Sequence, residues 1–360
     1  MSLRRRARPA LGRSLTSSAL SLPSAAQVAA ARDNIRPFAL RTPLLRLNAD
    51  LNANIFLKLE NLQPLGSFKI RAAVNVLKTM DAVGLQRGVL TASAGNFGQG
   101  LAFAARAMGV PATVVVPSGA AETKVKALLE LGAKVVRRSF DEWWTVLTSR
   151  SCAGEDGVFV HPVAEPGVLA GNATIGAEIL EELPGCDTVV VPFGGGGLIC
   201  GIGSVMRRLR PTVRMIVAES EAAQPAGAAL RHGGPVTVPH RQSFVDGMGS
   251  TTVLPEMWPL LHAVADQSEC ASFEQIAAAI RLLAGRHHVI AEAAGAVSVA
   301  AALGAQAALG TQAALGAHVA LGAHAALVMQ GAKGNIVCIV SGGNIDTEKL
   351  GAILAGQSPF

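Results

Sequence analysis

Short apolar segments alternate with longer amphipathic segments between residues 88 and 138. The apolar segments GVLTAS, ATVVVP and AKVVRR are hydrophobic at consecutive positions, which is typical of parallel strands covered on both faces. Between them, QGLAFAARAMG and ETKVKALLELG place apolar residues at the three- and four-residue spacing of a helix. The pattern therefore predicts a βαβαβ unit built on a parallel sheet.

A second set of alternating segments follows further along the chain. DTVVVPF, VRMIVAES and NIVCIVSGGN predict strands, and LICGIGSVMRRL predicts a helix. Two such units agree with the two domains expected for 360 residues. Because parallel sheets bind ligands at the carboxyl ends of their strands, we expect the site at the loops SAGN, FGGGG and SGGN.

Charge changes this picture only at the N-terminus. The chain has 31 Lys and Arg against 25 Asp and Glu, but residues 1–32 hold six arginines and no acid, so the remaining 328 residues are neutral. A neutral body argues against nucleic-acid binding. Residues 1–23 form a basic tail, either an unstructured leader of a cytoplasmic protein or a transit peptide to the mitochondrial matrix. After it, Ser24 is predicted to cap the helix AAQVAAARDNI.

An uncharged stretch at residues 293–332 contains a tandem hexad. Six residues advance a helix by about 600°, so successive leucines fall about 120° apart and no face stays apolar. We interpret residues 300–330, approximately, as a low-complexity expansion of a helix or loop and predict no membrane span. The glycines that mark the repeat are Gly304, Gly310, Gly316 and Gly322.

The five cysteines are far apart and include no CxxC pair. This spacing fits neither a disulfide framework nor a zinc site. We expect reduced thiols, most of them buried.

Four consecutive glycines follow a predicted strand and open a predicted helix. Their unobstructed amides and the positive helix terminus predict a phosphate site. The segment GGGGLICGIG also contains GxGxxxG, one residue longer than the GxGxxG of dinucleotide sites, with Glu219 about twenty residues on, so a nicotinamide-dependent dehydrogenase is the alternative interpretation. The glycines are Gly194, Gly195, Gly196 and Gly197.

Lys69 lies in the segment LENLQPLGSFKIRAA, just after a predicted turn. Phe68 is apolar and Arg71 is cationic, and we expect both neighbours to lower the pKa of the lysine. A lowered pKa is what an amine needs to form a Schiff base.

The lysine motif and four further motifs in order resemble the fold type II pyridoxal-phosphate enzymes, in the threonine and serine dehydratase and serine racemase group. After the lysine motif come SAGNFGQG, HPVAEPGVLAGNATIGAEI, FGGGGL and SGGN, so that the resemblance covers about residues 42–344. It implies an α/β fold similar to the tryptophan synthase β subunit, with two three-layer parallel-sheet domains and the active site between them. The large domain would comprise residues 24–86 and 163–360, and the small domain residues 87–162. The lysine motif consists of Glu60, Asn61, Pro64, Gly66, Ser67, Phe68, Lys69 and Arg71.

The resemblance also implies a role for each motif. Lys69 would form the Schiff base and move the proton at the substrate Cα, Phe68 would pack beside the cofactor ring, and Asn96 would bind the ring oxygen. Ser341 would face the pyridine nitrogen. The phosphate would be bound by Gly194, Gly195, Gly196, Gly197 and Leu198, and the substrate carboxylate by Ser93, Ala94, Gly95, Asn96 and Gln99.

The implied reaction is β-elimination from a small β-hydroxy amino acid, L-threonine or L-serine, to a 2-oxo acid and ammonia. Serine racemases have a serine at the place of Ala94, and a methyl group carries no proton, so dehydration is favoured over racemisation. Phe97 stands where most members have histidine, and the alternative is a bulkier β-hydroxy amino acid. A further alternative is an inactive binding protein.

The resemblance bears on assembly and on metal binding as well. We expect a homo-oligomer that binds neither nucleic acid nor membrane. Glu219 matches the acid that binds a structural cation in the group. Pro225 replaces the second carboxylate, and Glu221 is the candidate to compensate for it.

Overall fold

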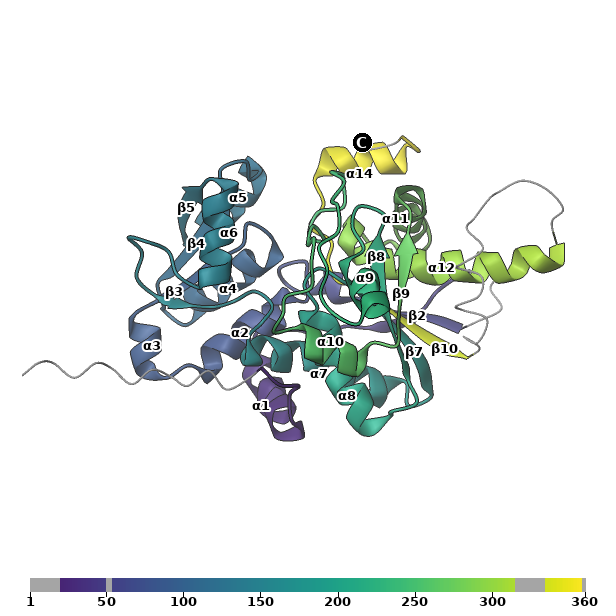
Figure 1. Ribbon diagram of the computed structural model, residues 1–360, viewed down its shortest axis with the longest axis horizontal. Helices are drawn as coiled ribbons and strands as arrows, with labels where there is room; N and C mark the ends of the chain where they lie inside the picture. Colours follow the sequence, from purple (N-terminus) through teal and green to yellow (C-terminus); the bar gives the residue numbers. More distant parts are fainter. Residues whose placement is uncertain (1–19, 50–53, 315–333, 358–360) are drawn as a thin grey trace, which may run out of the picture.

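The computed structural model describes residues 20–49, 54–314 and 334–357. These residues form two sheets side by side (Figure 1), a six-stranded sheet in the order β1-β2-β10-β7-β8-β9 and a four-stranded sheet in the order β5-β4-β3-β6. β1 pairs antiparallel with β2, and the other neighbours pair parallel. The strands of the larger sheet are β1 (Leu44–Arg46), β2 (Asn54–Lys58), β7 (Cys186–Pro192), β8 (Arg214–Ser220), β9 (Gln267–Ala271) and β10 (Asn335–Ile339).

The smaller sheet is continuous in sequence and confirms the predicted βαβαβ unit. All its strands lie within residues 89–159, inside the range expected for the small domain. The helices of this unit were predicted except for the third, α6, which Ser139 caps together with Glu142. The elements are β3 (Val89–Ala92), α4 (Asn96–Ala107), β4 (Ala112–Pro117), α5 (Glu122–Glu130), β5 (Lys134–Arg138), α6 (Phe140–Ser149) and β6 (Val158–Phe159).

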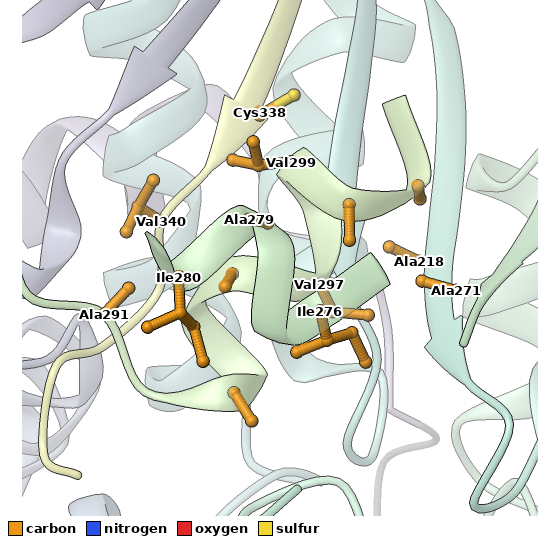
Figure 2. Packing of buried hydrophobic residues seen from close by; sticks show 14 of the residues in the cluster. Ala218, Ala271, Ile276, Ala279, Ile280, Ala291, Val297, Val299, Cys338 and Val340 are labelled. Carbon is orange, nitrogen blue, oxygen red and sulfur yellow. The ribbon is translucent and has the colours of Figure 1, made fainter. Parts of the chain in front are cut away.

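Helices cover both faces of the larger sheet, which explains why the middle positions of its central strands are apolar in succession. In β10, Ile336 and Cys338 pack into one buried cluster with α11 (Phe273–His287) and α12 (Ala293–Ala314). Val337 and Ile339 point the other way, into a cluster with α7 (Pro166–Glu182), α8 (Gly197–Leu209) and α10 (Trp258–Val264). Figure 2 shows the first cluster, where the side chains of α11 and α12 meet those of Ala218, Ala271 and Cys338.

Of the remaining helices, α2 (Lys69–Thr79) packs against both sheet units. α1 (Ala25–Ile35) begins with the predicted cap at Ser24, which forms a reciprocal capping box with Gln27. α2 packs closely against α4 and α7, since a Cβ at Gly100 would lie 3.2 Å from the Lys69 carbonyl oxygen and one at Gly171 only 2.6 Å from that of Arg71. The other helical elements are η1 (Glu60–Leu62), α3 (Ala82–Gln86), α9 (Pro225–His232) and α14 (Thr347–Leu354).

The hexads begin inside a helix. α12 runs to Ala314 and includes Gly304 and Gly310, whereas the later repeats and residues 1–19 of the basic tail lie outside the described residues. No helix in the described ranges has the length and hydrophobicity to cross a membrane. Four of the five cysteines are buried and none is in a disulfide, and the fifth, Cys270, is exposed.

Candidate active site

The loop after β10 is joined by hydrogen bonds to the segment that precedes α2. The Phe68 amide donates to the Ser341 carbonyl oxygen over 3.1 Å, and the Gly343 amide donates to that of Gly66 over 2.8 Å. Gly66 has φ +67, and a Cβ there would lie 2.4 Å from Asn344 Oδ1, so only glycine fits this turn. These contacts place Lys69, the first residue of α2, at the carboxyl end of β10.

Lys69 has an apolar environment. Its Nζ lies 4.9 Å from the centroid of the Phe68 ring and 5.7 Å from that of Phe97, and it donates to the Pro162 carbonyl oxygen over 3.4 Å. Burial lowers the pKa of Lys69 to about 8, and the nearby Glu292 carboxylate opposes this shift. A substantial fraction of the amine is therefore neutral, and nucleophilic, near physiological pH.

Arg71 does not act on Lys69 as the sequence analysis expected. Its guanidinium is fully buried and binds Glu60, with Nε to Oε2 and Nη2 to Oε1 both at 2.8 Å, and Glu178, with Nη1 to Oε1 at 2.6 Å. Only burial and Glu292 shift the pKa of Lys69. The expectation that Arg71 lowers this pKa is wrong, because two carboxylates neutralise its charge.

The glycine loop leaves the amino end of α8 open. Gly196 is the N-cap residue with φ +92, and no side chain caps the helix. A Cβ at Gly194 would lie 2.8 Å from the Gly247 carbonyl oxygen, and one at Gly195 would lie 2.8 Å from Val163 Cγ2. Uncapped amides at a helix terminus bind anions, and the close packing around them requires glycine. Leu198 is buried in the first turn of α8.

Asn96 is held by Glu292, which the sequence analysis missed, and by Asn344 of the SGGN loop. Asn96 Nδ2 donates to Glu292 Oε1 over 2.7 Å, and Asn96 Oδ1 accepts from Asn344 Nδ2 over 2.8 Å. Burial raises the pKa of Glu292 to about 7, an effect reduced by the Asn96 hydrogen bond. The only signal in the sequence was that Glu292 is the last charged residue before the uncharged stretch.

The predicted substrate loop lines two neighbouring cavities. Gly95, Asn96 and Gln99 line one of about 240 Å³, and Ala94 lines the other, of about 450 Å³. Ser93 lines neither cavity, and its amide donates to the Val115 carbonyl oxygen over 3.1 Å. Both cavities also contact Lys124, Asp246 and Asp346.

Ser341 is buried at the end of β10. Its Oγ donates to the Ala294 carbonyl oxygen over 3.1 Å. A hydroxyl has one hydrogen, so Ser341 gives up this bond whenever it donates to a ligand. Nearby, Ser67 Oγ is buried without a hydrogen-bond partner among the described residues.

Glu219 acts as a helix cap in this structure. Its two carboxylate oxygens accept from the amides of Ala226 and Gly227, both over 2.8 Å, and from Ser268 Oγ over 2.6 Å. Glu221 is similarly occupied by the Phe273 amide over 2.8 Å. Within the described ranges no three His, Cys, Asp or Glu residues cluster as metal ligands, and the expected structural cation is not supported.

Comparison with known proteins explains this arrangement. Residues 35–342 match the family of pyridoxal-phosphate dependent enzymes. The chain belongs to this family. The resemblance found in the sequence is therefore confirmed, and membership favours pyridoxal phosphate over the dinucleotide alternative.

Several relatives cover most of the chain. It is 36% identical over 329 residues to the L-threonine ammonia-lyase of Geobacter sulfurreducens, which covers 90% of this chain and 76% of the relative. It is 32% identical to the catabolic L-threonine dehydratase of Staphylococcus aureus, with 90% of each covered. The structure of maize serine racemase matches with a TM-score of 0.81 at 27% identity and covers 94% of this chain and 98% of that one.

Proposed function

We propose that this protein catalyses the pyridoxal-phosphate-dependent β-elimination of L-threonine or L-serine to a 2-oxo acid and ammonia. One observation carries the proposal: a lysine of lowered pKa and an uncapped glycine loop flank the same segment, residues 162–163. The similarity to an L-threonine ammonia-lyase over 90% of the chain supports the choice of substrate.

The residues around this point fit the cofactor. The glycine loop and Leu198 would bind its phosphate through the amides at the start of α8. Asn96 has one amide hydrogen without a partner among the described residues, which suits the ring oxygen. Phe68 would pack beside the ring, and Ser341 would face the pyridine nitrogen after releasing the Ala294 carbonyl.

When bound, pyridoxal phosphate supplies an aldehyde that condenses with amines and a ring that withdraws electrons from the substrate Cα. Lys69 would hold the cofactor through its amine and, as a free amine, would take the proton from the substrate Cα. The loop of residues 93–99 and the start of α4 orient the substrate carboxylate. The Ser341 hydroxyl is a weaker acid than a carboxylic acid or an ammonium group, so it leaves the pyridine nitrogen unprotonated and favours prompt loss of the β-hydroxyl over a long-lived carbanion.

Ala94 separates this reaction from racemisation. Racemisation needs an acid/base group on the face of the Cα opposite Lys69, and the methyl group of Ala94 can neither give nor accept a proton. We therefore expect the β-hydroxyl to leave once the Cα proton is lost, because the methyl group of Ala94 cannot return a proton to the Cα from the opposite face.

Turnover of three substrates tests the proposal. We expect purified protein loaded with the cofactor to form 2-oxo acid and ammonia in equal amounts from L-threonine or L-serine, and less from a β-aryl serine. Lys69→Ala abolishes turnover, and Lys78→Ala, on the exposed end of the same helix, preserves it. D-serine formation without 2-oxo acid overturns the assignment in favour of a racemase, and turnover of the β-aryl serine alone favours the bulkier substrate.

We further propose a cytoplasmic homo-oligomer. A small amino-acid substrate is supported by the similarity to an L-threonine ammonia-lyase. Sedimentation of the full chain gives the mass in solution. The mature N-terminus determined from cells distinguishes the retained leader from a cleaved transit peptide.

A further inference from the structure

We propose that His161 is a positioning residue that couples the Schiff-base lysine to the phosphate loop. It does so by fixing residues 162–164, which contact both. The mechanism above assigns no role to His161, which is 3% exposed and lies just after β6.

His161 acts as a double acceptor. Its Nδ1 accepts from the Val163 amide over 3.0 Å and from the Ala164 amide over 2.8 Å. Two donors on one ring nitrogen require that nitrogen to carry no hydrogen, so the neutral ring has its hydrogen on Nε2. The imidazole thus closes a tight turn where the chain passes from β6 to α7.

The turn contacts both halves of the cofactor site. The Pro162 carbonyl oxygen accepts from Lys69 Nζ over 3.4 Å. Val163 packs against the glycine loop, since its Cγ2 would lie 2.8 Å from a Cβ at Gly195 and its carbonyl oxygen 3.4 Å from one at Gly197. A shift of this turn therefore moves the carbonyl that Lys69 contacts and the wall behind the phosphate together.

His161 Nδ1 remains a hydrogen-bond acceptor over the pH range in which Lys69 titrates. Burial lowers the pKa of His161 to about 3, and the charges of Arg150 and Lys69 lower it in the same direction. On the other side of the turn, Arg150 Nη2 donates to the Ala164 carbonyl oxygen over 2.9 Å. His161 therefore stays neutral where Lys69 titrates, and the turn keeps both of its amide hydrogen bonds.

Two substitutions separate the acceptor from the bulk of the ring. His161→Asn places Oδ1 the same number of bonds from Cα as Nδ1 and keeps the acceptor, whereas His161→Leu keeps apolar volume and leaves two amides without a partner. His161→Gln, whose acceptor is one methylene further out, serves if the leucine variant does not fold. Val146→Ala, in a neighbouring buried cluster of the same sheet, is the control for lost stability alone.

The measurements use binding and labelling, so they do not depend on which amino acid is turned over. Dissociation constants of pyridoxal phosphate and of pyridoxal, which lacks the phosphate, report on the glycine loop. Competitive acetylation of Lys69 against pH, in protein without cofactor, reports on the amine.

We expect His161→Leu, or His161→Gln in its place, to weaken pyridoxal phosphate at least tenfold and pyridoxal less. The labelling midpoint of Lys69 should move up from about pH 8. His161→Asn should stay within threefold of the wild type in both measurements. The proposal is overturned if the leucine or glutamine variant matches Val146→Ala in both, or if His161→Asn is as impaired as His161→Leu.

Discussion

Burial shifts the pKa values of Lys69 and Glu292, two titratable groups at the site, in opposite directions. Lys69 loses its proton more readily, with a pKa of about 8, and Glu292 holds its proton more tightly, with a pKa of about 7. Both shifts favour the neutral form, as desolvation must. Near neutral pH each group can gain or lose a proton at a small cost in free energy. This suits Lys69 for moving the proton at the substrate Cα. It also makes the hydrogen bond from Asn96 to Glu292 dependent on pH.

Glu292→Gln should change how stability depends on pH. Between about pH 4.5 and 7 the unfolded carboxyl has lost its proton and the folded one retains it, so the native state binds more protons and stability falls as pH rises. The loss amounts to about 3 kcal/mol across this window. Urea unfolding of the cofactor-free protein at pH 5 and pH 8 measures it. The difference between variant and wild type should grow by that amount toward pH 8, and parallel curves would contradict it.

At the scale of elements, an ion-pair network fixes the first turn of α2. The first residue of this helix is Lys69, and two residues further along the buried guanidinium of Arg71 joins η1 through Glu60 to α7 through Glu178. Lys58 of β2 adds a second buried ion pair to Glu178 at 2.8 Å. This network holds the helix that carries the lysine, so its role is to position Lys69 and not to tune its charge.

Arg71→Leu should destabilise the fold strongly. Removing the guanidinium leaves Glu60 and Glu178 buried without their main partner, which costs about 3–5 kcal/mol. Chemical denaturation measures the loss, with Arg106→Leu on the exposed side of α4 as the control. A loss below about 1 kcal/mol would show that the carboxylates find other partners.

The glycine loop offers a second test at this scale. Gly196→Ala introduces a side chain at φ +92 and 3.2 Å from Phe193 Cε2, so the loop must shift. Pyridoxal phosphate should bind at least tenfold more weakly, with pyridoxal changed less than threefold. Gly285→Ala, with open space around its Cβ position, is the control. Equal weakening of both ligands would place the phosphate elsewhere.

At the scale of the whole molecule, polar contacts cross between the two sheet units at the mouth of the cavities. Asp246 binds Lys124 of α5 at 3.3 Å and Lys349 of α14 at 3.1 Å. Asn96 makes the corresponding contact inside, to Glu292. Residues from both sheet units therefore line the cavities.

The part of the hexad repeat that the structure describes, up to residue 314, contributes no residue to the two cavities. The buried residues of α12, where burial is described, run from Ala293 to Ala302. We therefore expect deletion of residues 311–322, two repeats, to leave kcat/KM and cofactor affinity within about twofold of the full chain. Steady-state kinetics and absorbance titration check this, and a loss of tenfold or more would assign the repeats a role.

The sequence by itself determined what depends on local pattern. Uniformly apolar segments gave the parallel strands, and Ser24 gave the start of α1. The motifs gave Lys69, Asn96, the glycine loop and the family, because each is a short run whose spacing alone carries the information.

Only the tertiary structure decided the partners of these residues. Asn96 and Glu292 are 196 positions apart, and Arg71 and Glu178 are 107 apart. Such pairs form only when the elements that carry them pack together and exclude water. The hydrophobic periodicity of the sequence therefore does not predict them. For the same reason the sequence analysis expected Arg71 to act on Lys69 and Glu219 to bind a cation. The folded chain instead brings Arg71 to the carboxylates of Glu60 and Glu178. It brings Glu219 to the first amides of α9.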